Sequence, residues 1–247
     1  MESSEQSVVK PYEGEGDGKK KQVSRMFDRI APYYDFLNRL LSLGIDVQWR
    51  KKMVQKFRDI KPRVLMDVAT GTGDVALEIV KSLDPEKVVG MDISKEMLEI
   101  GKNKISKKGL SEKIEMVVGD SENIQFADNT FDGISVAFGV RNFENLDLGL
   151  KEMLRVLKPG GKLVILEFSK PKVFPVKQVF NGYFKYILPQ IGKLTSKDAS
   201  AYEYLYRSVQ AFPDREAFKE RLEKIGYKAT TWEGLTFGIC SIYTGIK

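Results

Sequence analysis

Two aspartates frame the part of the chain whose residue types could hold a ligand. Asp67 and Asp92 each lie at the end of an apolar run, and the loop Gly71-Thr72-Gly73 lies between them, before a helical pattern that begins at Asp74. Glycines let the backbone approach a ligand because they carry no Cβ. An acid after the second run can accept hydrogen bonds from both hydroxyls of a ribose. The pattern predicts a βαβ unit that holds a nucleoside.

This unit alone leaves two cofactors open. Residues 71–76 fit the G-x-G-x-x-A pattern of dinucleotide-binding oxidoreductases, so a nicotinamide cofactor is one alternative. The loop has no Lys or Arg for a diphosphate, however, and Asp67 and Asp74 give it acidic surroundings. Because such surroundings attract cations, we expect S-adenosylmethionine, which carries a sulfonium and an amine.

The composition excludes several classes of function. The chain has 247 residues, 42% apolar and 30% charged, which is typical of one soluble globular domain. It has no histidine, so Ser-His and Cys-His catalysis and histidine-bound metals are excluded. Its single cysteine, Cys240, excludes an internal disulfide and a cysteine metal cluster, and we expect no metal. The net charge of +6 comes without a long basic run, so we expect no nucleic-acid partner.

Apolar runs alternate with helical patterns, which predicts a mostly parallel sheet with helices on both faces. The polar residues 1–22 are predicted to be a disordered tail, and residues 23–247 a single domain. A helical extension over 23–60 precedes the glycine loop, and a helical insertion over 170–212 follows the fifth strand. The expected strands cover 64–67, 88–92, 114–118, 131–138, 162–168, 227–232 and 237–246.

The insertion contains an amphipathic pattern. Apolar residues recur at helical spacing between Val176 and Leu188, while lysines, Gln178 and Asn181 occupy the other face. A helix facing the core is the plain interpretation; the alternatives are a helix that lines an apolar cavity or rests on a membrane. We see no signal peptide and no apolar run of membrane-spanning length. We therefore expect a cytoplasmic protein that at most touches the inner face of a membrane.

Three blocks together resemble the S-adenosylmethionine-dependent C-methyltransferases of ubiquinone and menaquinone biosynthesis. The blocks are residues 26–49 with Tyr34-Asp35 and Trp49, residues 67–74, and residues 155–169 with Lys158-Pro159-Gly160-Gly161. The Lys-Pro-Gly-Gly piece alone marks only the wider methyltransferase class, whereas the combination is much more specific. The resemblance covers nearly all of the chain after Val23. It implies a Rossmann-like class I methyltransferase fold with seven strands, in which 23–60 forms a lid and 170–212 a cap over the substrate.

The resemblance implies roles for residues around the cofactor. It places Thr70, Gly71 and Gly73 at the methionine part, Asp92 at the ribose hydroxyls, and Asp120 with Ser121 at the adenine amine, while Asp67 suits a cationic or hydroxyl group. Simpler interpretations stay open at three of these positions. Asp92 and Asp120 end strands, where an acid also caps the following helix, and Thr70 is a common turn residue.

Arg141 and Asn142 follow the fourth strand, at the edge where open α/β sheets bind ligands. The Asn/Asp-Pro-Pro-aromatic element of base-amino methyltransferases is missing there. A guanidinium can stabilise a phenolate, which makes a neighbouring ring carbon nucleophilic, or orient a water that takes the proton. The resemblance also implies catalytic roles for Arg141, Asn142 and Tyr34. A surface arginine in an ion pair is the alternative interpretation of Arg141.

The acceptor implied by the resemblance is a reduced prenylated quinol. We expect methylation of demethylmenaquinol to menaquinol, the last step of menaquinone biosynthesis, with a 2-polyprenyl-6-methoxy-1,4-benzoquinol of ubiquinone biosynthesis as the alternative. A nicotinamide-dependent oxidoreductase, a non-catalytic binding protein and an RNA methyltransferase are the rival hypotheses. A homodimer and a peripheral membrane contact are both compatible with the sequence.

Overall fold

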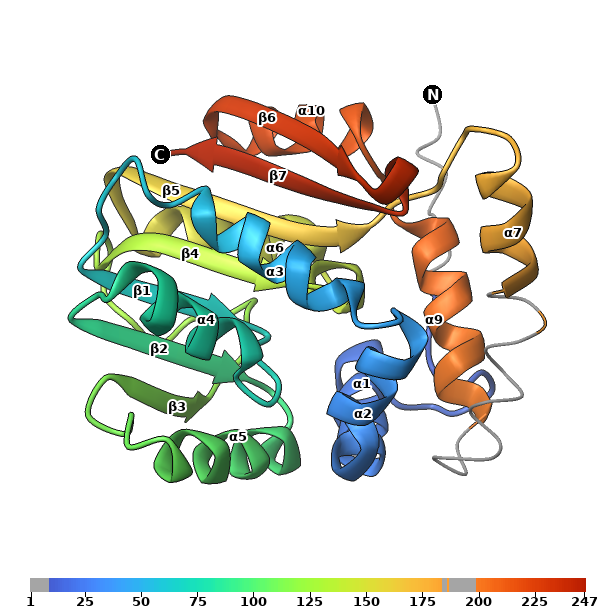
Figure 1. Ribbon diagram of the computed structural model, residues 1–247, viewed down its shortest axis with the longest axis horizontal. Coiled ribbons are helices and arrows are strands. Elements are labelled where there is room, and N and C mark those ends of the chain that lie inside the picture. The colour runs from blue at the N-terminus through green and yellow to red at the C-terminus, as the bar shows by residue number, and fades with distance from the viewer. Residues whose placement is uncertain (1–8, 184–185, 187–198) are drawn as a thin grey trace.

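One seven-stranded sheet organises the chain (Figure 1). The computed structural model describes residues 9–183, 186 and 199–247. The strand order is β3-β2-β1-β4-β5-β7-β6; the first five strands of the chain are parallel, and β7 runs antiparallel to both β5 and β6. The strands are β1 Val64–Val68, β2 Lys87–Asp92, β3 Ile114–Val118, β4 Phe131–Ala137, β5 Leu157–Phe168, β6 Lys228–Leu235 and β7 Cys240–Ile246. The expected fold is confirmed.

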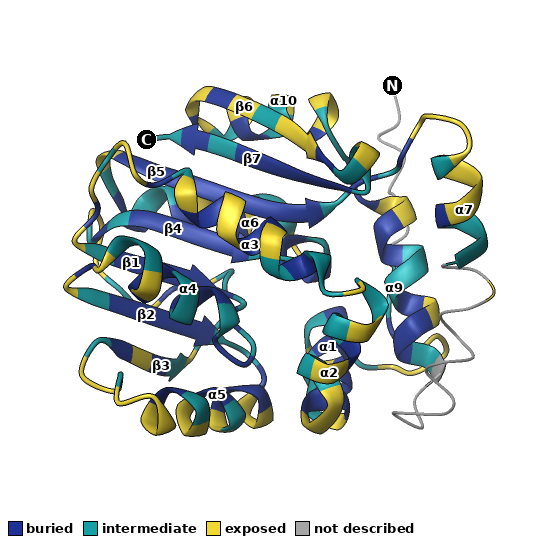
Figure 2. Cartoon of the chain, in the orientation of Figure 1, coloured by how far each residue is buried: buried dark blue, intermediate teal, exposed yellow. Residues whose placement is uncertain are grey.

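Helices cover both faces of this sheet, as predicted (Figure 1). One face carries α3 Ile45–Gln55, α4 Asp74–Leu83 and α5 Lys95–Lys107, and the other carries α6 Leu146–Val156 and α10 Glu216–Ile225. Neighbouring residues of β1 show the alternation that requires two covered faces. Leu65 packs in the cluster that contains Met53 of α3, whereas Met66 packs in the cluster that contains Met153 of α6. The dark-blue central strands in Figure 2 show this burial.

The turns between these elements follow from local chemistry. Ser94 caps α5 because its Oγ accepts a hydrogen bond from the Met97 amide at 3.2 Å. Gly73 precedes α4 with a left-handed φ of 80°, which costs glycine little. The Pro159-Gly160-Gly161 turn lies within β5, where the register with β4 shifts, instead of ahead of the strand.

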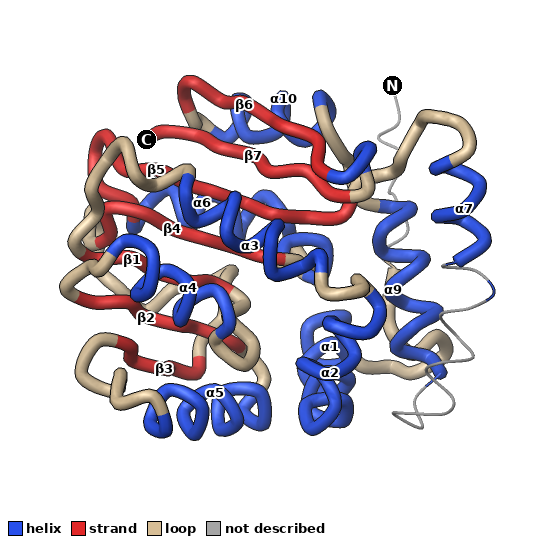
Figure 3. The backbone as a smooth tube through the Cα atoms, in the orientation of Figure 1, coloured by secondary structure: helices blue, strands red, loops and turns tan. Residues whose placement is uncertain are grey.

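A second group of helices lies beyond the carboxyl ends of the parallel strands (Figure 3). It comprises α1 Lys19–Ile30, the short η1 Ala31–Tyr33, α2 Tyr34–Leu41, α7 Val176–Gly182 and α9 Ala199–Ala211. Val23, Leu37, Phe180 and Tyr204 pack together in one apolar cluster. The extension and the insertion, far apart in sequence, therefore form one layer. The last part of the extension differs, since α3 packs on the sheet itself.

The expected tail over residues 1–22 was too long. The helix α1 begins at Lys19, and Gln22 is fully buried. The Gln22 side chain accepts a hydrogen bond from the Tyr12 amide at 2.9 Å and donates one to the Asp17 carbonyl at 3.0 Å. A polar segment can pack when its side chains bond to backbone groups, and composition alone does not reveal that. Residues 1–8 lie outside the described part of the chain.

The predicted amphipathic helix over 176–188 is observed in part. The helix α7 covers Val176–Gly182, and most of the remainder of the pattern lies outside the described residues. None of the helices in residues 9–183, 186 and 199–247 combines the length and apolarity needed for a membrane span.

Candidate active site

The strand order reverses between β1 and β4, which is the place where open α/β sheets bind ligands. The residues that follow these strands, Ala69 and Phe138, both have a left-handed backbone, with φ of 53° and 57°. Such non-glycine conformations store strain and concentrate at functional sites. Gly139 comes so close to Ala69 that an added Cβ would lie 2.6 Å from the Ala69 Cβ. The backbone is thus shaped tightly around this crevice.

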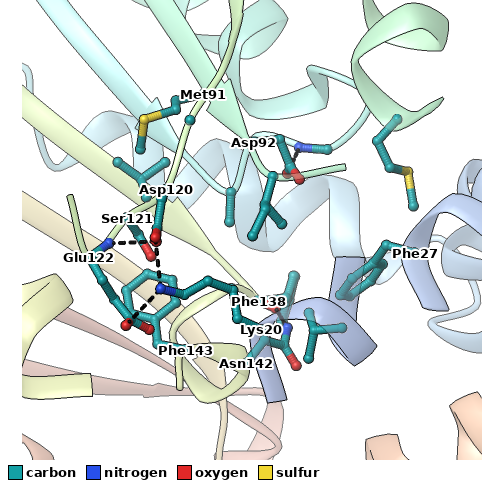
Figure 4. A pocket seen from close by; sticks show the side chains of 18 of the residues that line it. Lys20, Phe27, Met91, Asp92, Asp120, Ser121, Glu122, Phe138, Asn142 and Phe143 are labelled. Carbon is teal, nitrogen blue, oxygen red and sulfur yellow. Dashed lines mark hydrogen bonds and ion pairs between the residues drawn. The ribbon is translucent and has the colours of Figure 1, made fainter. Parts of the chain in front are cut away.

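A pocket opens at this point, which we call the strand-end pocket (Figure 4). Six of the residues singled out in the sequence line it: Tyr34, Gly71, Asp92, Asp120, Ser121 and Asn142. They come from α2, the glycine loop, the ends of β2 and β3, and η2 Val140–Asn142. The structure therefore brings these six residues together, and their roles stay predictions.

Asp92 is held in place by two backbone amides. Its two carboxylate oxygens accept hydrogen bonds from Gly71 and Ser94, each at 2.8 Å. Burial raises the pKa of Asp92, while these amide bonds oppose the rise. Both oxygens keep further lone pairs, so the side chain can still accept hydroxyl donors from a ribose.

Asp120 is engaged by a lysine that the sequence did not suggest. Lys20 of α1 places its Nζ 2.7 Å from Asp120 Oδ2 and 3.0 Å from Glu122 Oε2 (Figure 4). The free volume of the pocket is only about 80 Å³. Sites for small molecules measure about 300–1,000 Å³. Lys20 thus occupies the Asp120 carboxylate at which the adenine amine is expected.

Asp67 and Thr70 lie beside this pocket, not in its lining. They line a smaller recess together with Tyr34. Asp67 is fully buried and accepts hydrogen bonds from the hydroxyls of Thr70 and Ser135, each at 2.6 Å. Burial raises the pKa of Asp67 to about 6, against the opposing effect of these two hydroxyls. Gly73 lines neither space and serves as the cap residue of α4.

A much larger cavity, which we call the apolar cavity, lies between the helical layer and the sheet. Its volume is about 460 Å³. The lining is mainly apolar and comes chiefly from α1, α2, α3, α7, α9 and the ends of β4 and β5, with Met26, Leu37, Trp49, Phe168, Val176, Val179, Phe180, Leu205 and Ile239 among its residues. Such a space suits a greasy ligand with few polar groups.

Arg141, which lies in η2 just after β4, is one of the two arginines among the described residues that line the apolar cavity. Its Nη1 donates to Glu167 Oε1 at 2.9 Å, and its guanidinium lies over the Phe168 ring at 5.5 Å from the centroid. The Glu167 side chain is completely buried, and that of Arg141 is 8% exposed. Burial raises the pKa of Glu167, and the charge of Arg141 opposes this rise. The alternative of an ion pair is thus realised, but inside the cavity and not on the surface.

The two spaces share a wall. Phe27, Tyr34, Phe138 and Asn142 line both the strand-end pocket and the apolar cavity. Asn142 donates from Nδ2 to the Phe138 carbonyl at 3.3 Å, while its buried Oδ1 has no partner among the described residues. Burial raises the pKa of the Tyr34 phenol, so it stays neutral. Two ligands, one in each space, would meet at these residues.

Lysines at the start of α1 tie the helical layer to this wall. Lys19 Nζ donates to the carbonyls of Arg141 and Phe143 at 3.0 and 2.8 Å, and its burial lowers the pKa of Lys19 to about 8. Sequence reasoning missed Lys19, Lys20 and Glu167. Only Glu167 had a local signal, as a lone acid in the apolar run of β5.

Comparison with known proteins supplies the family. The model of the ubiE/COQ5 methyltransferase family matches residues 16–247. The chain belongs to this family. It is 51% identical to a demethylmenaquinone methyltransferase of Bacteroides fragilis over 98% of both chains. It is 48% identical to a ubiquinone/menaquinone biosynthesis C-methyltransferase of Geotalea daltonii, over 93% of this chain and 97% of the relative.

Solved structures confirm the fold. A putative S-adenosylmethionine-dependent methyltransferase of Methanococcus maripaludis aligns with a TM-score of 0.61 and 23% identity, covering 95% of this chain and 97% of that one. A possible histamine N-methyltransferase of Thermotoga maritima aligns with a TM-score of 0.63 and 17% identity, covering 91% and 99%. The resemblance seen in the sequence is confirmed, and the protein is an S-adenosylmethionine-dependent methyltransferase. These comparisons give no support to the oxidoreductase alternative.

Proposed function

We propose that the protein methylates a ring carbon of demethylmenaquinol, with S-adenosylmethionine in the strand-end pocket and the quinol in the apolar cavity. The observation that carries this proposal is the wall common to both spaces, formed in part by Tyr34 and Asn142. A methyl group can pass between two ligands only where their sites touch, and oriented contact supplies much of the rate enhancement.

The residues of the strand-end pocket fit this cofactor. Asp92 offers carboxylate oxygens to the ribose hydroxyls, and Asp120 offers them to the adenine amine. Ser121 lies next to Asp120 in the same pocket. The orphaned Asn142 Oδ1 is a buried acceptor that needs a donor from a ligand. Thr70, Gly71 and the acid Asp67 would contact the methionine end of the cofactor. When bound, the cofactor supplies an electrophilic methyl group on a sulfonium.

Arg141 of the apolar cavity and the residues of the shared wall position and activate the acceptor. Arg141 stabilises the phenolate oxygen next to the accepting ring carbon, which directs electron density onto that carbon. Arg141 and Asn142 would orient a water that takes the hydroxyl proton of the quinol, and the ring proton would leave to water once the carbon has received the methyl group. The apolar lining excludes other water from the reacting atoms.

The choice of naphthoquinol rests on the relatives, since the most similar ones compared are named demethylmenaquinone methyltransferases. The test is methyl transfer to short-chain demethylmenaquinol and to a matched methoxy-benzoquinol, both kept reduced, followed by mass spectrometry. Faster methylation of the naphthoquinol is expected. Methylation of the benzoquinol alone would transfer the proposal to the ubiquinone pathway, and methylation of neither would refute it.

We also propose peripheral contact with a membrane around the mouth of the apolar cavity. Among the described residues, eleven large apolar side chains are exposed, and nine belong to segments that line or flank this cavity. The most exposed are Leu43, Phe174 and Phe237, at 85%, 77% and 76%. Exposed Lys172 and Lys177 lie beside Phe174 in sequence and suit anionic lipid headgroups. A prenylated substrate could then enter without crossing water.

Vesicle sedimentation tests this contact. Wild-type protein should bind phosphatidylglycerol vesicles more strongly than phosphatidylcholine vesicles, and the triple change Leu43→Ser, Phe174→Ser and Phe237→Ser should weaken both. The control replaces Val118 and Leu148, the two exposed apolar residues elsewhere. Equal binding by both variants would remove the proposal. A homodimer, which is compatible with the sequence, stays a prediction. Analytical ultracentrifugation would test it.

A further inference from the structure

Polar atoms without partners gather around the apolar cavity. Among the described residues, six buried side-chain nitrogen or oxygen atoms have no hydrogen-bond partner, and four of them belong to residues that line this cavity. Those four are Arg141 Nε, Asn142 Oδ1, Tyr202 OH and Tyr204 OH. A buried polar group left unpaired costs about 1–3 kcal/mol. The presence of several such atoms around one cavity indicates that a bound ligand supplies their hydrogen-bond partners.

Other buried tyrosines of this protein do have partners. Tyr227 OH donates to the Leu150 carbonyl at 3.0 Å, and Tyr243 OH accepts from the Arg215 amide at 2.6 Å. Both of these side chains are as deeply buried as that of Tyr204. In the cavity lining, Tyr183 OH likewise donates to the Leu41 carbonyl at 3.1 Å, whereas the hydroxyls of Tyr202 and Tyr204 have no partner among the described residues.

Tyr204 is the better placed of the two unpartnered tyrosines. It lies on α9 and is 2% exposed. The charges of Arg141 and Glu167 both act on the pKa of its phenol, in opposite directions. Burial raises the pKa of Tyr204 well above that of a free phenol, so its proton is retained. The hydroxyl is a neutral hydrogen-bond donor in the same cavity as the guanidinium.

We propose that Tyr204 donates a hydrogen bond to the second ring oxygen of the quinol, the one across the ring from the oxygen stabilised by Arg141. This inference rests on the proposed function of the cavity. Arg141 then activates one oxygen and Tyr204 recognises the other, so the pair selects rings that carry two para oxygens. A site built to bond a substrate oxygen rejects an analogue that lacks it, because the buried donor stays unpaired.

Tyr204→Phe is the direct test, with Tyr206→Phe on the same helix as its control. Loss of one hydrogen bond should lower kcat/KM for demethylmenaquinol about three- to tenfold and leave affinity for S-adenosylhomocysteine unchanged. Because the hydroxyl has no partner in the free protein, the melting temperature should not fall. Tyr227→Phe, which removes a satisfied bond, should lower the melting temperature without this kinetic effect.

A substrate analogue separates recognition from general damage. The analogue is a prenyl naphthol that keeps the hydroxyl next to the accepting carbon and lacks the one across the ring. Wild-type enzyme should discriminate against it, and Tyr204→Phe should lose most of that discrimination. If Tyr204→Phe lowers kcat/KM equally for both compounds, or if Tyr206→Phe has the same effect as Tyr204→Phe, the inference is wrong.

Binding can be followed without turnover. Trp49 lines the cavity, so quenching of its fluorescence reports occupancy by menaquinol or by the naphthol. A wild type that transfers no methyl group to any quinol would refute the proposed function. The inference about Tyr204 would still be tested by whether Tyr204→Phe binds menaquinol more weakly and the naphthol equally well.

Discussion

Arg141 Nη1 lies 2.9 Å from Glu167 Oε1, and water reaches almost nothing of either side chain. The Glu167 carboxylate also accepts a hydrogen bond from the Phe168 amide at 2.8 Å, which fixes its orientation. The guanidinium of Arg141, which we propose stabilises a substrate oxygen, is thereby held in place by a carboxylate that lines neither the strand-end pocket nor the apolar cavity. Glu167 is a positioning residue in this arrangement.

Glu167→Gln should leave the charge of Arg141 buried and unpaired. Removing one partner of a buried pair typically costs about 3–5 kcal/mol, and we expect that loss in the free energy of unfolding, measured by urea denaturation. Methyl transfer should fall with it. Adding Arg141→Gln should restore much of the stability but no activity. A single variant with wild-type stability and turnover would contradict this role.

Arg141→Ala should abolish methyl transfer and leave cofactor binding intact, because Arg141 lines the apolar cavity and not the strand-end pocket. Calorimetry with S-adenosylhomocysteine and a quinol methylation assay measure the two effects separately. Arg141→Lys keeps the charge without the forked donors and should retain partial activity. Lost cofactor affinity, or normal turnover in the alanine variant, would exclude the assigned role.

Asp92→Ala should weaken cofactor binding about tenfold to a hundredfold, since hydrogen bonds to charged groups contribute about 1.5–3 kcal/mol. The control is Asp84→Ala, an exposed acid whose ion-pair partner is Lys113. Isothermal titration with S-adenosylhomocysteine gives both affinities. Unchanged affinity in the Asp92 variant would remove its assignment to the ribose.

Lys20→Ala should make the strand-end pocket easier to enter. The ion pairs of Lys20 with Asp120 and Glu122 are partly exposed, and such pairs contribute about 0.2–1 kcal/mol. Removing them should speed cofactor association about two- to fivefold in stopped-flow measurements. Slower association or weaker binding would mean instead that Lys20 itself contacts the ligand.

Asp67 should make stability depend on pH. Its pKa of about 6 in the folded protein exceeds the ordinary value of 3.8, so between these values the folded state binds more protons than the unfolded state. The free energy of unfolding therefore falls as pH rises through this window. The full shift corresponds to about 3 kcal/mol. Relative to wild type, Asp67→Asn should become more stable by about that amount between pH 4 and 7; a constant difference would contradict the pKa.

The cofactor residues could be predicted because their signal is local. Asp92 and the Gly71 loop follow from two apolar runs and the short segment between them, and the sheet order then fixes where the ends of those runs meet. The burial of Glu167 was also implicit, since a charged residue inside an apolar strand must have a partner. The identity of that partner, Arg141, depended on the fold.

Contacts across long sequence separations could not be predicted from composition. Lys20 precedes its partner Asp120 by 100 residues, and no residue near Lys20 in the sequence indicates that it pairs with an acid of the strand-end pocket. The same polar residues that make the segment before Val23 look unstructured bond to backbone groups in the fold. The sequence predicts only a helical insertion around Tyr204, because the role of its hydroxyl depends on the cavity that the residue lines.

The antiparallel strand β7 has a consequence for how the chain is made. The strand β6 pairs only with β7, yet it leaves the ribosome first, while β5 waits for the same partner. Until residues 240–246 emerge, one side of β5 stays unpaired and β6 has no strand to join. The nascent chain thus presents open strand edges late in translation, when association with a neighbouring chain competes with folding.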